Sequence, residues 1–132
     1  MNFDNLLQRI MDSDVNIRHS IITDIHGSIL AVSHRDGVVN YLTEEETRAS
    51  LKRAASAWQG RRALSTKIGP GTYALAAFQK ITRITFPLGS ENLIFVSMGS
   101  EGVRQSFHEG GRQQIVSKVL GILSRDPTRA NG

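Results

Sequence analysis

The stretch SIITDIHGSILAVSH, residues 20–34, decides how the chain folds. It contains two short apolar runs separated by four residues, from Asp24 to Gly27. An aspartate side chain accepts hydrogen bonds from the backbone that follows it, and glycine adopts a positive φ without a steric penalty. The stretch therefore predicts a tight turn that joins a strand beginning at Ile17 to a second strand over 28–34.

Side chains in the first of these strands alternate with a period of two, as they do in a strand whose faces differ. The alternation predicts two sets of three residues on opposite faces of the sheet, namely Ile17, His19 and Ile21 on one face and Arg18, Ser20 and Ile22 on the other. A connection as short as residues 24–27 makes the two strands antiparallel.

Helical spacing appears on both sides of the hairpin and again near the end of the chain. Apolar positions between 3 and 11 recur as one face of a helix. Thr43 followed by Glu46 predicts a helix start, because the two side chains can satisfy each other's backbone amides. That helix is expected to end before the turn at 69–71. After a break at two glycines, 110 and 111, the spacing of Ile115, Val119 and Ile122 predicts a closing helix.

Three more strands are expected, over 72–80, 81–88 and 92–98. The last, NLIFVSM, is apolar on both faces, which is typical of a strand in the middle of a covered sheet. The predicted order is α-β-β-α-β-β-β-α, an α+β fold with a five-stranded antiparallel sheet and helices on both faces. Residues 1–125 are expected to form one domain, and the polar segment 126–132 a flexible C-terminal tail.

The chain resembles the roadblock/dynein light-chain family, whose fold is related to profilins and longins. The resemblance rests on the D-x-x-G-x-x-L-A pattern of Asp24, Gly27, Leu30 and Ala31, and on the order of the elements. A second segment, KIGPGTYALAAFQKITRITFPL at 67–88, resembles small uncharacterised archaeal proteins of this type. The resemblance implies that the fifth strand lies between the first and the fourth, and that the third strand lies at an edge.

An edge position for TYALAAFQ, residues 72–79, would leave a row of backbone amides and carbonyls open to another chain, since this stretch contains no charge and no proline. By resemblance, roadblock domains dimerise by joining these strands and packing their second helices together. The residues expected at the dimer or partner interface are Trp58, Arg62, Tyr73, Leu75, Ala77 and Phe78. Core packing is an equal alternative for Trp58, and the helix is expected to end before Arg62 unless that side chain reaches across the interface.

The function expected from these features is a non-enzymatic protein-interaction module, a homodimeric scaffold or regulator. The resemblance implies a small GTPase or a signalling complex as the partner. Two alternatives stay open: a PAS-like sensor of a small ligand, and a nucleic-acid-binding protein that uses the net charge of +4. The residues expected to contact an anionic partner are Arg48, Lys52, Arg53, Arg61 and Lys67.

Motifs for catalysis are not found in the sequence. The chain has no cysteine, no Gly-x-Ser-x-Gly elbow and no phosphate-binding loop. His19, His26 and His34 lie near the first turn, but strand alternation places His19 and Asp24 on opposite faces, which argues against a metal site. No catalytic residue, metal or cofactor is therefore expected. The absence of a long apolar run or of a secretory signal favours a cytoplasmic protein without a membrane span.

Overall fold

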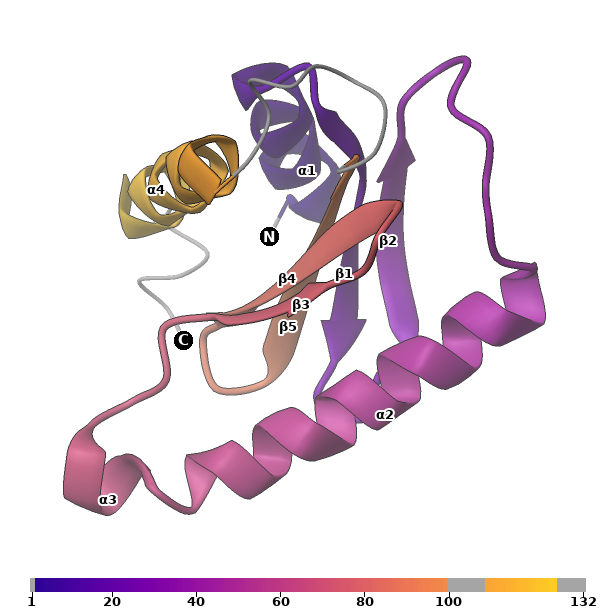
Figure 1. Ribbon diagram of the computed structural model, residues 1–132. Helices are drawn as coiled ribbons and strands as arrows, with labels where there is room; N and C mark the ends of the chain where they lie inside the picture. Colours follow the sequence, from indigo (N-terminus) through magenta and orange to yellow (C-terminus); the bar gives the residue numbers. More distant parts are fainter. Residues whose placement is uncertain (1, 100–108, 126–132) are drawn as a thin grey trace.

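The computed structural model describes residues 2–99 and 109–125, and its elements follow the predicted order (Figure 1). The helices and strands are α1 (Phe3–Ser13), β1 (Ile17–Asp24), β2 (Ile29–His34), α2 (Glu44–Arg62), α3 (Ser65–Ile68), β3 (Ala74–Ala77), β4 (Ile81–Leu88), β5 (Asn92–Gly99) and α4 (Glu109–Arg125). The short helix α3 is an addition to the prediction. The segment 126–132, for which a flexible tail was predicted, lies outside the described residues.

The five strands form one antiparallel sheet in the order β2-β1-β5-β4-β3. The central position of β5 is confirmed, and every residue from Leu93 to Gly99 is buried. The position of β3 at one edge is confirmed as well. The opposite edge of the sheet is β2.

Helices cover both faces of this sheet (Figure 1). Helices α1 and α4 share the larger core with one face, built around Phe86 of β4, Ile94 of β5 and Leu7 of α1. Helix α2 covers the other face through a much smaller core. That smaller core consists of Ile21, Leu51, Ala55, Trp58, Leu93 and Phe95.

The predicted face of Ile17 is wrong, because a β-bulge interrupts the alternation of β1. Ile17 lies opposite Met98, whereas His19 lies opposite Ser97, so β1 has one extra residue at this point. A bulge of this kind moves the preceding side chain to the other face of the sheet. Ile17 therefore joins the larger core, while Ile21 packs beneath α2.

The predicted ends of two helices also need correction. The Thr43 hydroxyl accepts a hydrogen bond from the Glu46 amide at 3.1 Å and the Glu46 carboxylate accepts one from the Thr43 amide at 2.9 Å, which confirms the helix start. The helix, however, includes Arg62. The two glycines at 110 and 111 lie in the first turn of α4 and do not break it, since glycine lowers helix propensity without preventing helix formation.

The expected third strand is shortened at both ends. Only Ala74–Ala77 pairs with β4, and the Phe78 amide donates to the Ile81 carbonyl at 2.8 Å. This hydrogen bond closes the tight connection into β4, so that 78–80 form a turn. On the other side, 69–73 connect α3 to the strand.

The hairpin of residues 24–27 holds α2 in place. One Asp24 carboxylate oxygen accepts hydrogen bonds from the amides of His26 and Ser28, and Gly27 has a φ of 87°. A Cβ atom at Gly27 would lie 2.8 Å from the Cα atom of Lys52 in α2. The absence of a side chain thus allows the turn to touch the backbone of the helix.

Candidate functional site

The outer side of β3 is a row of unpaired backbone groups. In an antiparallel ladder, residues alternate between those whose backbone groups face the partner strand and those whose groups face away. The bond from the Phe78 amide to the Ile81 carbonyl sets this alternation, so Ala76 and Ala74 face β4. The amides and carbonyls of Leu75 and Ala77 therefore face the open edge, beyond which no strand lies within the described part of the chain.

The side chains of β3 leave apolar surface exposed along this edge. Leu75 is opposite Ile84 of the larger core, yet it is 43% exposed, and Phe78 is 59% exposed. On the side of α2, Ala74 packs against the smaller core and Ala76 follows two residues later. The structure therefore places Tyr73, Leu75, Ala77 and Phe78 at one edge of the sheet, where the small side chains of Ala74 and Ala76 lie on the side of α2.

Trp58 and Arg62 lie elsewhere, at the C-terminal end of α2. Trp58 is only 3% exposed and is packed in the smaller core, which agrees with the core alternative. The Arg62 guanidinium donates to the Ser90 carbonyl at 2.8 Å within the same chain. With Arg61, these residues line a surface hollow of about 500 Å³.

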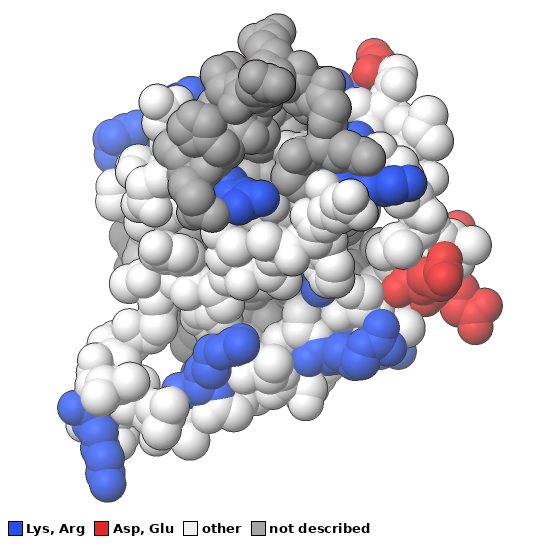
Figure 2. Space-filling view, viewed as in Figure 1, with Lys and Arg blue, Asp and Glu red and all other residues white. Residues whose placement is uncertain are grey.

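The cations of α2 and α3 do not form a single patch (Figure 2). Arg48 and Lys52 face the β1–β2 hairpin, whereas Arg61 lies in the hollow beside Trp58. Arg53 lies near Arg83 of β4. Burial of the Arg83 guanidinium, and in addition the positive charge of Arg53, lower the pKa of Arg83. Lys67 is exposed on α3.

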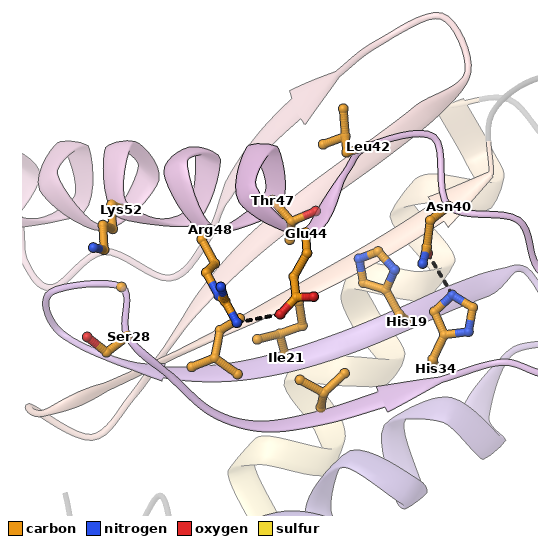
Figure 3. A pocket seen from close by; sticks show the side chains of 13 residues that line it. His19, Ile21, Ser28, His34, Asn40, Leu42, Glu44, Thr47, Arg48 and Lys52 are labelled. Carbon is orange, nitrogen blue, oxygen red and sulfur yellow. Dashed lines mark hydrogen bonds and ion pairs between the residues drawn. The ribbon is translucent and has the colours of Figure 1, made fainter.

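A groove of about 670 Å³ separates the first half of α2 from the hairpin (Figure 3). Its floor includes the apolar side chains of Ile29 and Val32, and its roof carries Arg48, Lys52 and Glu44 from α2. Arg48 and Glu44 form an ion pair. The spacing of Arg48 and Lys52 places them on one helix face, but the groove itself was not predicted, because the path of α2 over the hairpin cannot be read from spacing.

The histidines near the turn do not gather around a common point. His19 and His34 lie opposite each other on β1 and β2, and their rings stack with centroids 5.9 Å apart. The Nε2 atom of His34 is 2.8 Å from the Asn40 amide oxygen. Within residues 2–99 and 109–125, no three His, Cys, Asp or Glu side chains are placed to share a metal ion.

Stability is expected to fall as the pH drops below about 6.5, because His19 is held in its neutral form. Burial, and then the charges of His34, Arg18 and Arg83, lower the pKa of His19 from 6.5 to about 4. Between these values the unfolded chain binds the proton more strongly than the folded chain does, so acid favours unfolding. We expect a loss of about 2 kcal/mol between pH 7 and pH 5.

Urea denaturation at the two pH values measures this loss. His19→Phe keeps an aromatic ring on His34 and removes the titrating group, so its loss of stability over the same interval should be clearly smaller. An equal loss in both proteins would show that other groups cause the acid sensitivity.

Comparisons with known proteins give the class of fold. No protein-family model and no curated protein sequence matches the chain. Among solved structures, a roadblock/LC7 domain from Streptomyces avermitilis has a TM-score of 0.66 at 10% identity, covering 94% of this chain and 93% of its own. An MglB protein with a tetrameric arrangement has a TM-score of 0.61 at 11% identity, with coverages of 92% and 87%.

The similarity extends to profilins. Profilin II of Acanthamoeba castellanii has a TM-score of 0.55 at 12% identity, covering 90% of this chain and 94% of its own. The chain therefore has the roadblock/profilin-like fold that its hairpin pattern indicated. No helix among the described residues is both long and apolar enough to cross a membrane.

Proposed function

We propose that this protein is a non-enzymatic interaction domain that forms a homodimer through β3 and presents the joined surface to a protein partner. The observation that carries the proposal is the open edge of β3, with the backbone groups of Leu75 and Ala77 directed outward. Unpaired edge strands without charge or proline readily accept a strand from another molecule.

Pairing with a second copy would give the outward backbone groups of β3 hydrogen-bond partners in both molecules. Two β3 strands related by a two-fold axis run antiparallel, so each supplies the donors and acceptors that the other lacks. The exposed side chains of Leu75 and Phe78 would be covered at the same time. On the α2 face, the small side chains of Ala74 and Ala76 leave room for a helix of the second copy. The tetrameric arrangement of an MglB protein of the same fold supports self-association.

The partner that we propose is a small GTPase or a signalling complex that contains one. The resemblance to roadblock domains implies this class of partner and a cytoplasmic location. The exposed cations along α2 and α3, such as Arg48 and Lys67, offer contacts for acidic surfaces. We also propose that residues 1–125 form a single folded domain and that 126–132 form a flexible C-terminal tail.

The two alternatives have less support from the geometry. A nucleic acid would favour a continuous basic surface, whereas the cations are spread over several places. Arg48 and Lys52 line the groove, Arg61 lies in the hollow beside Trp58, and Lys67 lies on α3. A PAS-like sensor would enclose its ligand, whereas the groove between α2 and the hairpin is open along the β2 edge.

Sedimentation velocity tests the homodimer. At micromolar concentration, the wild-type protein is expected to sediment with the mass of two 14.5 kDa chains. The dimer should persist in high salt, because the proposed contact consists of backbone hydrogen bonds and apolar side chains. A monomer throughout the concentration range would contradict the proposal.

A further inference from the structure

The second edge of the sheet, β2, also has outward-facing backbone groups. The Arg35 amide donates to the Arg18 carbonyl at 2.9 Å, which sets the alternation along the β1–β2 ladder. Ser33 and Ala31 therefore face β1, and the amide and carbonyl of Val32 face outward. In the described part of the chain, no strand pairs with β2 on that side.

The groove shown in Figure 3 lies directly beside this edge. The side chains of Val32 and Ile29 are 52% and 37% exposed and form part of its apolar floor. The roof is held above the floor at the hairpin tip, where Gly27 approaches the backbone of α2 and the Gln59 side chain donates to the Ile25 carbonyl at 3.2 Å. Floor and roof are thus parts of one packed unit.

The roof is predominantly positive. Arg48 and Lys52 lie one helical turn apart on α2, and both line the groove (Figure 3). Glu44 is the one carboxylate among the residues that line it, and its charge is shared with Arg48 in an ion pair. An acidic side chain that enters the groove therefore meets a net positive charge, centred toward Lys52.

We propose that β2 and this groove bind an extended acidic segment of a partner protein, which adds to the sheet as a sixth strand. Every second side chain of an added strand points toward α2. The methylene groups of glutamates at these positions would cover Ile29 and Val32, and their carboxylates would reach Arg48 and Lys52. This site is separate from the proposed dimer contact, which uses the opposite edge.

An extended peptide fits these observations better than a small anion does. A small anion would need only the two cations, and it would leave the outward amide and carbonyl of Val32 and the apolar floor uncovered. Strand addition uses all three features at once, with the backbone supplying affinity and the alternate side chains supplying specificity. The acidic character follows from the charge of the roof.

A labelled peptide of alternating valine and glutamate, about seven residues long, is the probe for this site, since it is long enough to pair along the 6 residues of β2. Fluorescence anisotropy is expected to show binding to the full-length protein that weakens with added salt. The matched control is the same peptide with lysine in place of glutamate, which should not bind. Failure of the acidic peptide to bind, or equal binding of both peptides, would overturn the proposal.

A proline substitution tests whether the peptide adds as a strand. Val32→Pro removes an outward amide that makes no bond to β1, so the fold should survive and peptide binding should be lost. Val32→Ala removes most of the side chain but keeps the amide, and should weaken binding by only a few-fold. Unchanged binding to a folded Val32→Pro variant would show that the peptide merely contacts the cations, which contradicts strand addition.

Charge substitutions test the roof of the groove. Lys52→Glu should weaken binding of the acidic peptide about tenfold, and Glu44→Gln should tighten it by releasing Arg48 from its ion pair. Lys67→Glu changes the net charge as Lys52→Glu does, but on α3, and should have little effect. Equal weakening by Lys52→Glu and Lys67→Glu would mean that only overall charge matters. Peptide binding should persist in a Leu75→Pro monomer, so the proposed peptide site and the proposed homodimer are tested independently.

Discussion

Gly27→Ala is expected to lower the free energy of unfolding by about 3 kcal/mol. Two costs add at this position. A φ of 87° is unfavourable for an L-residue, by about 1–2 kcal/mol. In addition, the new Cβ atom would lie 2.8 Å from the Cα atom of Lys52 and 2.9 Å from the carbonyl oxygen of Leu51, and forced overpacking of this kind costs about 1–3 kcal/mol. Both neighbours are backbone atoms, so α2 itself would have to move.

Gly37→Ala provides the matched control for this prediction. Gly37 has a similar φ of 80°, but a Cβ atom there would have no neighbour within 4 Å. Urea denaturation of both variants at one protein concentration separates the backbone cost from the cost of displacing α2. If Gly27→Ala were no more destabilising than Gly37→Ala, the close contact between hairpin and helix would not contribute to stability.

Leu75→Pro is expected to convert the dimer into a folded monomer, raising the dissociation constant at least about a hundredfold. The proline removes an outward amide from the proposed contact and presents a ring to the incoming strand. Its effect on the fold should be small, because this amide makes no hydrogen bond to β4. Sedimentation gives the mass, and circular dichroism reports on the fold.

Ala76→Pro is the contrasting substitution one residue further along. The Ala76 amide faces β4, so its loss should destabilise the β3–β4 pairing itself. A Leu75→Pro variant that is folded and still dimeric would show that the two copies associate through another surface.

The fold was predictable from the sequence because its strongest signals are local. The turn from Asp24 to Gly27 requires an antiparallel hairpin, and a strand such as NLIFVSM, apolar on both faces, must lie inside the sheet. The edge position of β3 came from the resemblance to roadblock domains. The structure then showed which of its backbone groups face outward.

The errors arose where the structure depends on distant parts of the chain. The bulge beside Ile17 is a feature of the pairing with β5, and alternation along one strand does not reveal it. Arg62 belongs to α2, and its guanidinium donates to the Ser90 carbonyl, a partner so far along the sequence that spacing within the helix does not reveal it. The groove beside Val32 likewise depends on the angle at which α2 crosses the hairpin, which local spacing does not determine.

Cysteine cross-linking tests the central claim, that β3 pairs with β3 of a second copy. The chain has no cysteine, so a single cysteine introduced in turn at each of positions 74–77 is a unique thiol. Residues opposite each other in an antiparallel pair have Cα atoms about 4.5–5.5 Å apart, which is within the range that a disulfide spans. Under mild oxidation, the position nearest the two-fold axis is expected to give a covalent dimer, while Leu30→Cys on β2 should give no covalent dimer. No cross-link at any position of β3, or equal cross-linking at Leu30, would contradict the account.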